Sequence, residues 1–239
     1  MQLPRQGPGG DAETRIALGM CSLGTDARLH VADLSCGTGA TALLLAETLN
    51  AEITAVDSFS EFLDELMRNA KSKSLAHKIR PVQAPLDALP FEENSLDLIW
   101  AEDSVFTIGF EAGIGAWKPF LRPGGYLVVS DITWLSVKRP AALTAFWKEA
   151  YPEAGLPSAK MRVLEKHGFC PVGYFPLPEH CWTDNYHHPL QQAFEAFLNR
   201  NGNSGAAQAI VGNVQAEISF YNQYKSWYSY GMYVARKLV

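Results

Sequence analysis

The stretch that decides the fold reads Val31-Ala32-Asp33-Leu34-Ser35-Cys36-Gly37-Thr38-Gly39-Ala40-Thr41. Its first residues are mostly apolar, as in a buried strand, and two glycines then lead into a helix-forming segment. Small residues let a backbone approach a ligand closely, and the free N–H groups at a helix N-terminus face whatever lies above the tip of the strand. The stretch therefore predicts a turn that cradles a nucleotide.

The residues around this turn indicate which nucleotide it binds. Residues 37–42 fit the G-x-G-x-x-A pattern of a dinucleotide fold, and Asp57 follows at the distance of a ribose-binding acid. Asp33, however, lies inside the turn, where its charge repels a pyrophosphate and attracts an ammonium group. S-adenosylmethionine carries such a group, so it is favoured, and an NAD(P)-binding Rossmann enzyme is kept as the weaker alternative.

At this point the chain resembles the class I S-adenosylmethionine-dependent methyltransferases. Five segments match that family's motifs in the right order, namely Asp33 to Gly39, Ile53 to Asp57, Ala84 to Phe91, Leu96 to Glu102 and Phe120 to Asp131. They resemble, in turn, the first motif, the second strand with its ribose acid, the segment that covers the adenine, the fourth strand, and the loop with the fifth strand. The chain departs from the family where Ser35 replaces the usual first glycine.

Three further segments resemble a narrower group, the UbiE-like or type 11 methyltransferases, among them uncharacterised prokaryotic members. These segments are Arg5 to Gly9, Trp147 with Ala150 to Glu153, and Cys181 to Asp184 with Tyr186. The resemblance implies the reaction class and leaves open the acceptor and the type of atom that is methylated.

The alternation of strand and helix patterns predicts an α/β fold. Buried strands are expected at 29–34, 52–57, 79–84, 95–101 and 126–131, with helices between them and a tight Pro123-Gly124-Gly125 turn before the fifth strand. Helices are expected to begin at the capping residues Asp11 and Ser60. The family resemblance implies a Rossmann-like, seven-stranded, mostly parallel sheet with helices on both faces and an antiparallel last strand.

The length of 239 residues favours a single methyltransferase domain. Within it we expect an arm and helix at 1–28, the cofactor-binding core at 29–176, a loop and small helical cap at 177–228, and the final strand at 229–239. Residues 186–228 have a helical period, which predicts two helices separated near 202–205.

Composition excludes several classes of function. The net charge of −5 and the lack of a basic run argue against a nucleic-acid partner. Four widely spaced cysteines favour reduced thiols over a disulfide framework. No apolar run reaches membrane-spanning length and no signal peptide is evident, so we expect a soluble, cytoplasmic protein without a membrane partner.

The acids at the predicted strand ends are the main candidates for cofactor binding. Asp57 offers two oxygens to the two ribose hydroxyls, although an aspartate there also suits a helix cap. Asp87, beside the backbone of Leu86, suits the adenine amino group, or only a turn before Leu89-Pro90. Phe59 suits the adenine face, or only the core.

The resemblance also assigns the other cofactor contacts. Gln6 and Gly7 would fold over the cofactor, although a disordered terminus is the alternative for this proline- and glycine-rich arm. The full expected set of cofactor-binding residues is Gln6, Gly7, Asp33, Ser35, Cys36, Gly37, Thr38, Gly39, Asp57, Ser58, Phe59, Leu86, Asp87 and Ala101.

The methyl acceptor is expected to be a small molecule that meets Glu102, either as a general base or as a binding group. Asp103 lies beside it. Trp182 and Tyr186 would form a substrate-facing wall, with His187 as a further candidate base. A zinc site from His180, Cys181, His187 and His188 has the wrong spacing, so no metal is expected.

Two further points concern the whole chain. The aromatic residues between Tyr221 and Tyr228 have helical spacing and suit the core or a homodimer contact. A protein that binds S-adenosylmethionine without catalysis is the alternative to an enzyme.

Overall fold

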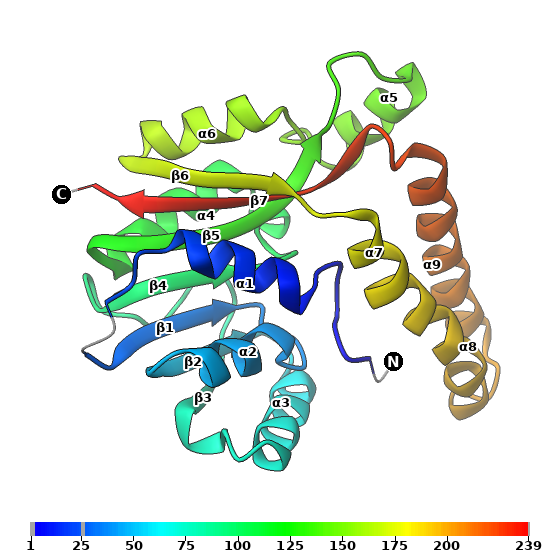
Figure 1. The fold of residues 1–239 in the computed structure, drawn as a ribbon. Helices are drawn as coiled ribbons and strands as arrows, with labels where there is room; N and C mark the ends of the chain where they lie inside the picture. The colour runs from blue at the N-terminus through cyan, green and yellow to red at the C-terminus, as the bar shows by residue number, and fades with distance from the viewer. Residues whose placement is uncertain (1–2, 25–26, 239) are drawn as a thin grey trace.

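A computed structural model describes residues 3–24 and 27–238 of the chain (Figure 1). Seven strands form one sheet in the order β3-β2-β1-β4-β5-β7-β6. The strands are β1 (Leu29–Leu34), β2 (Ala51–Asp57), β3 (Ile79–Gln83), β4 (Leu96–Ala101), β5 (Leu121–Trp134), β6 (Phe169–Pro176) and β7 (Tyr228–Lys237). β7 runs antiparallel to both neighbours and the other pairs are parallel, so the expected Rossmann-like α/β fold is confirmed.

Helices connect these strands and form a cap beyond the sheet. The α-helices are α1 (Asp11–Met20), α2 (Ala40–Thr48), α3 (Ser60–Ser72), α4 (Phe110–Trp117), α5 (Ala141–Ala150), α6 (Pro157–Lys166), α7 (Glu179–Trp182), α8 (His188–Arg200) and α9 (Gly205–Tyr224). Short 3-10 turns η1 (Ala76–Lys78), η2 (Val105–Thr107) and η3 (Lys118–Phe120) and a π-helical turn η4 (Thr183–His187) complete them. None of the helices in the described ranges is long and apolar enough to cross a membrane.

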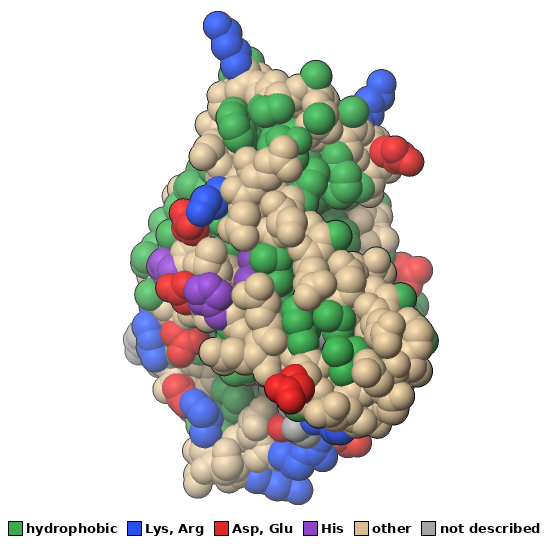
Figure 2. Space-filling model, turned by 90° about the vertical axis from the view of Figure 1, so that its right-hand side faces the viewer, with side chains coloured by type: hydrophobic (Ala, Val, Ile, Leu, Met, Phe, Trp, Pro, Cys, Tyr) green, Lys and Arg blue, Asp and Glu red, His purple; other side chains and the backbone are tan. Residues whose placement is uncertain are grey.

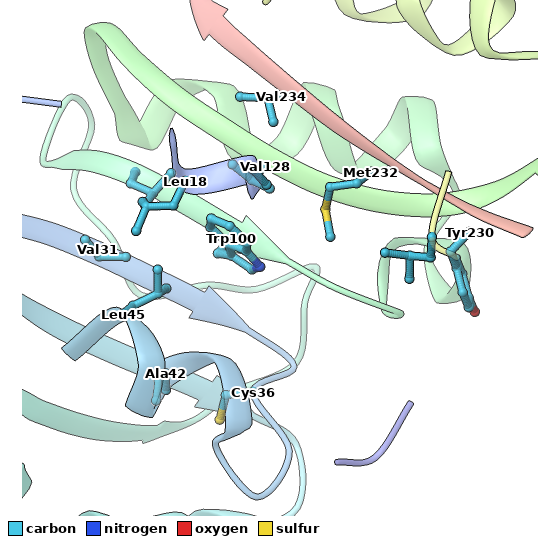
Figure 3. Packing of buried hydrophobic residues seen from close by; sticks show 14 of the residues in the cluster. Leu18, Val31, Cys36, Ala42, Leu45, Trp100, Val128, Tyr230, Met232 and Val234 are labelled. Atoms are coloured by element: carbon cyan, nitrogen blue, oxygen red, sulfur yellow. The ribbon is translucent and has the colours of Figure 1, made fainter. Parts of the chain in front are cut away.

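The parallel strands have apolar side chains on both faces because helices cover both faces. Successive residues of a strand point to opposite sides, so Val31 and Trp100 join one core cluster while Ala32 and Ile99 join the other. Figure 3 shows Leu18 of α1 near Trp100 on the first of these faces. The core thus fixes each strand's register against its neighbours.

This register brings the carboxyl ends of the strands together at one edge. Asp33 of β1 pairs with Ala55 of β2 and with Trp100 of β4. Asp57 is the last residue of β2, and β4 ends at Ala101. The cap helices α7, α8 and α9 lie on the side of the molecule toward which these strands point (Figure 1). The edge and the cap therefore enclose the region where ligands bind in such sheets.

The fifth strand differs from its expected form. Pro123-Gly124-Gly125 was expected as a turn before it, but β5 already begins at Leu121. The pairing with β4 shifts between Leu96 and Leu98, and Gly124 has φ +80°, so the glycines form a bulge within the strand. A bulge lets the chain begin pairing early and still bring Tyr126 into register.

Other local expectations need correction. Gly10 and Phe59, and not Asp11 and Ser60, are the N-caps of α1 and α3, and neither helix has a side-chain cap bond. The segment expected as a loop after β6 is helical in α7 and η4. The two expected cap helices are α8 and α9, separated near 201–204 as the glycines suggested.

Candidate active site

The turn between β1 and α2 has the backbone that its sequence predicts. Ser35, Gly37 and Gly39 all have positive φ, at +56°, +53° and +92°. Ser35 thus adopts the left-handed conformation for which glycine is usually selected, and this explains how serine can stand in the family's first glycine position. A Cβ on Gly39 would lie 2.1 Å from Cδ1 of Leu66, so this glycine lets α2 pack closely on α3.

Asp33 lies beneath this turn and is 2% exposed. Its Oδ2 atom is buried and has no hydrogen-bond partner among the described residues. Burial, followed by the nearby Glu102 carboxylate, raises the pKa of Asp33 well above its usual range, while Arg5 acts in the opposite direction. A buried carboxylate oxygen without a donor is costly, so this atom is suited to a ligand that brings an N–H group.

A small cavity of about 80 Å³ lies above the turn and in front of Asp33. Seven expected cofactor-binding residues line it, namely Gln6, Gly7, Asp33, Ser35, Cys36, Gly37 and Thr38. Glu102 and Asp103 line its other side. The turn, the arm and the end of β4 therefore line one cavity.

The N-terminal arm is packed across this cavity. Gln6 Nε2 donates to Thr38 Oγ1 at 3.3 Å, and Thr38 Oγ1 donates to the carbonyl of Leu3 at 3.2 Å. The N–H of Gly9 donates to the carbonyl of Cys181 at 3.3 Å, and Asn185 donates to the carbonyl of Gly9 at 2.7 Å. The described part of the arm thus joins the turn to the cap. Met1 and Gln2 lie outside the described residues.

Both carboxylate oxygens of Asp57 accept hydrogen bonds from the protein backbone. Its Oδ2 accepts the N–H of Gly37 at 2.9 Å and its Oδ1 accepts the N–H of Phe59 at 3.0 Å. The side chain is buried and links the turn to the start of α3. Each carboxylate oxygen has a second lone pair, so Asp57 can still accept from ribose hydroxyls while it makes these two bonds.

The lining of the first cavity does not include the remaining expected cofactor residues, namely Gly39, Asp57, Ser58, Phe59, Leu86, Asp87 and Ala101. Ser58, Phe59 and Asp87 are exposed, with Phe59 61% exposed. Leu86 is buried and its carbonyl accepts the indole N–H of Trp117 at 3.1 Å. The segment around Asp87 is a turn, as the simpler alternative expected.

Glu102 is held by three donors. Trp100 Nε1 donates at 2.7 Å, Thr14 Oγ1 at 3.3 Å, and Arg5 forms an ion pair at 2.9 Å. The Arg5 and Glu102 side chains are only 10% and 12% exposed. The Glu102 carboxylate therefore links the arm, through Arg5, and α1, through Thr14, to the end of β4. The sequence did not predict this structural role.

A larger cavity of about 550 Å³ lies between the sheet edge and the cap. Its wall is largely aromatic and consists of Phe106, Phe146, Trp147, Trp182, Tyr186, Phe220, Tyr228 and Tyr230. Trp182 stacks on Tyr221 at 4.4 Å and on Tyr230 at 5.1 Å between ring centroids. Trp182 and Tyr186, which were predicted to form a substrate-facing wall, both line this cavity.

Figure 2 shows the outer side of the cap, where hydrophobic side chains form separate clusters among polar ones.

Asp103 lines both cavities, together with Pro8. Its φ of +49° is in the left-handed region, its N–H donates to Ser130 Oγ at 2.8 Å, and the Tyr230 hydroxyl donates to its Oδ1. Burial raises the pKa of Asp103 to about 7, and the Tyr230 hydrogen bond acts against this rise. The carboxyl group therefore titrates near neutral pH at the junction of the two cavities.

His187 is 2% exposed and does not line either cavity. Its Nε2 lies 3.4 Å from Glu217 Oε1, and its ring packs on Trp182 and Tyr221. Asp103, in contrast, lines both cavities, and the role of His187 as a base stays a prediction.

Glu217 and the aromatic wall beyond Trp182 and Tyr186 were not predicted from the sequence. Asn213, Glu217 and Phe220 are spaced as i, i+4 and i+7 on α9, which places them on one helix face toward the cavity. Tyr221 and Tyr228 are buried, so they belong to the core and not to a dimer contact. The spacing on α9 was the available indication of the missed residues.

Two residues of the segment His180 to His188 lie in a group of possible metal ligands, together with Glu13 of α1. Glu13, His180 and Cys181 have ligand atoms within 4.8 Å of one another. Burial raises the pKa of the Cys181 thiol to about 12, so it stays protonated near neutral pH.

Known proteins resemble part of this chain in sequence. Residues 31–125 match the family described as a methyltransferase domain. An uncharacterised protein of Haemophilus influenzae is 28% identical over 128 residues, which cover 52% of this chain and 50% of that protein. Tocopherol O-methyltransferase of Arabidopsis thaliana is 28% identical over 164 residues, covering 67% of this chain and 42% of that protein. The chain thus spans half or less of the length of these curated relatives.

A solved structure agrees over nearly the whole fold. A methyltransferase from Geobacter sulfurreducens, solved in complex with S-adenosyl-L-homocysteine, superposes with a TM-score of 0.83 at 14% identity and covers 97% of this chain and 92% of its own. Residues 31–125 thus match a methyltransferase domain, and the fold of the chain is that of this solved structure.

Proposed function

We propose that the protein transfers the methyl group of S-adenosylmethionine to a small-molecule acceptor held in the aromatic cavity. The observation that carries this proposal is the meeting of two different cavities at Asp103. One cavity is polar and is built on the glycine turn, and the other is largely aromatic. Such an arrangement can hold the methyl donor in one cavity and the acceptor in the other, with the accepting atom in line with the C–S bond.

The residues around the first cavity fit the cofactor. Asp33 Oδ2 is a buried acceptor without a donor, which suits the ammonium group of the amino-acid portion. Gly37 has no side chain that would enter the cavity. A Cβ at this position would lie 2.8 Å from Gln6 Cγ, which is too close for an ordinary contact. We further propose that Asp57 accepts from the ribose hydroxyls and that Phe59 and Asp87 contact the adenine.

The arm must move to admit the cofactor. The cavity of about 80 Å³ is much smaller than the roughly 300 Å³ at which ligand pockets begin. Gln6 and Gly7 fill the space above the turn. We propose that the arm opens for the cofactor and then closes over it, with the Arg5–Glu102 ion pair as its fastening.

The chain's own residues then have distinct roles. When bound, S-adenosylmethionine supplies a methyl group on a sulfonium, whose sulfur is a good leaving group. The turn and the arm hold it and exclude water, Glu102 anchors the arm, and Asp103 receives the proton that the acceptor loses. The wall of Trp182 and Tyr186 orients the acceptor.

Calorimetry tests the binding half of this proposal. S-adenosyl-L-homocysteine is titrated into the wild type and into Asp33→Asn, with Asp64→Asn on the exposed side of α3 as the matched control. We expect binding by the wild type and the control, and about tenfold weaker binding by Asp33→Asn. No heat with the wild type would refute the proposal. Binding without S-adenosylhomocysteine formation from any acceptor would instead indicate a non-catalytic binding protein.

Several wider statements remain our proposals. We propose one domain over residues 1–239 and a cytoplasmic location. We also propose that the protein has no nucleic-acid partner, which the net charge of −5 and the pI of about 5.7 support. A homodimer remains a prediction, to be tested by sedimentation.

A further inference from the structure

The charges around the aromatic cavity are all of one sign. Two carboxylates, those of Asp103 and Glu217, line it, and the described residues that line it include no lysine, arginine or histidine. Asp103 also makes no ion pair among residues 3–24 and 27–238. A cavity of this kind disfavours an anionic ligand and favours a cationic one.

The two carboxylates lie at different depths. Glu217 is exposed, with 45% of its side chain accessible, so it lies toward the outer end of the cavity. Asp103 borders the cofactor cavity as well, so it lies where the methyl-accepting atom must be. A cation paired with Asp103 would therefore have its nitrogen at the junction of the two cavities.

The geometry of Asp103 leaves one oxygen for the ligand. Tyr230 donates to Oδ1, whereas no described protein group donates to Oδ2. The side chain is directed by a left-handed backbone and by the N–H bond to Ser130. Such a conformation costs about 1 kcal/mol for a residue other than glycine, which suggests that the direction of this carboxylate matters.

The rings suit the rest of such a ligand. Trp182 is buried and held in a stack with Tyr221 and Tyr230, so the wall is rigid before the ligand arrives. Aromatic rings stabilise both an apolar body and a nearby cation, by about 0.5–2 kcal/mol for the latter. The cavity thus combines apolar walls with an acid at its reactive end.

We propose that the methyl acceptor is an amine with an apolar body and that its nitrogen is the atom methylated, an inference that rests on the proposed function. The amine enters as an ammonium ion paired with Asp103. One N–H proton passes to the Asp103 carboxylate, and the nitrogen lone pair forms the new C–N bond as the C–S bond breaks. The electron pair of that bond stays on sulfur, which becomes a neutral thioether, and the proton leaves Asp103 for solvent.

Three ligands with the same phenylethyl body test the choice of an amine. These are 2-phenylethylamine, the neutral 2-phenylethanol and the anionic 3-phenylpropanoate. Binding is measured through the fluorescence of Trp147 and Trp182, which line the cavity, with S-adenosyl-L-homocysteine present at saturation. We expect the amine to bind at least about tenfold more tightly than the alcohol. A hydrogen bond to a charged group is more stable than a neutral one by about 1.4 kcal/mol, which corresponds to this ratio of affinities. The anion is expected to bind most weakly.

Variants assign the preference to a residue. Asp103→Asn retains an acceptor for Tyr230 and tolerates positive φ, so we expect it to fold and to reduce the amine-to-alcohol ratio to about one to two. Glu217→Gln is expected to lower the ratio by less, because that carboxylate is exposed. Asp64→Asn, which removes an exposed carboxylate on α3, is expected to leave the ratio unchanged.

The controls separate this inference from the proposed function. Saturation with S-adenosyl-L-homocysteine is verified by calorimetry on the same samples. If the homocysteine derivative binds and the wild type prefers the alcohol, or binds the two equally, the acceptor is not an amine while the proposed function stands. An amine preference that persists in Asp103→Asn would equally overturn the role of Asp103. Absence of cofactor binding would refute the proposed function instead.

Discussion

Replacing Asp57 by asparagine should weaken both folding and cofactor binding. The two carboxylate oxygens accept the N–H groups of Gly37 and Phe59 at 2.9 and 3.0 Å. Asparagine keeps one acceptor and places an NH₂ group against the other N–H, which then has no partner. A lost bond to a buried charged acceptor costs about 2 kcal/mol, which corresponds to about 4–8 °C in melting temperature for a chain of this length.

The binding effect comes from the same atoms. With one oxygen lost, only one ribose hydroxyl retains its acceptor, so affinity for S-adenosyl-L-homocysteine should fall about tenfold. Differential scanning fluorimetry measures the first effect and calorimetry the second. Asp87→Asn is the control for stability, because Asp87 is exposed and its substitution should change stability by less than about 0.5 kcal/mol.

Two results would refute this reasoning. An unchanged melting temperature in Asp57→Asn would mean that the two N–H bonds contribute nothing to the turn. Reduced stability with unchanged affinity would mean that Asp57 is only a structural link between the turn and α3. Reduced affinity in Asp87→Asn without loss of stability would support its proposed contact with adenine.

Three more predictions concern the turn, the arm and the junction. Gly39→Ala should lower the unfolding free energy by about 2–4 kcal/mol in urea titrations, because φ is +92° and the new Cβ meets Leu66, whereas Gly19→Ala, with open space around it, should not. Arg5→Gln should speed amide hydrogen exchange at Gly9 about tenfold, since the ion pair with Glu102 fastens the arm; equal exchange rates would argue against that role. Because burial raises the folded pKa of Asp103 to about 7, above the unfolded value near 4, its ionisation lowers stability as pH rises between these values. The melting temperature of Asp103→Asn minus that of the wild type should therefore be higher at pH 8 than at pH 4. A difference that does not change with pH would contradict the raised pKa of Asp103.

The sheet could be predicted because its information is local. Apolar runs and small-residue turns recur along the chain, and strands such as β1 and β4 lie within a residue of their expected bounds. Such features depend on a few neighbouring residues, so the sequence determines them without knowledge of the whole fold.

The arm and the site geometry depend on distant contacts and were harder to predict. Arg5 is 97 residues from Glu102 in sequence, and Gly9 bonds to Cys181. A proline- and glycine-rich segment has no pattern that indicates such partners. The same limit applies within α1, where the apolar Ile16 is 50% exposed while the polar Glu13 and Thr14 are buried.

Asp103 illustrates why the chemistry of the site was only partly predicted. Its position after β4 was evident, but its positive φ and its bond from Tyr230, 127 residues later, were not. These features, and not the type of residue, place the carboxylate between the two cavities. The proposed role of Asp103 therefore rests on its position in the fold, and the role of Glu102 as a base or binding group stays a prediction.

The place of β7 has a consequence for how the chain folds during synthesis. β7 lies between β5 and β6, although it is made after both and after the whole cap. Until Tyr228–Lys237 leaves the ribosome, β5 and β6 each expose an unpaired strand edge, the kind of surface that promotes association between nascent chains. The last strand therefore closes the sheet late, and a ribosome paused shortly before it would hold a chain especially dependent on chaperones.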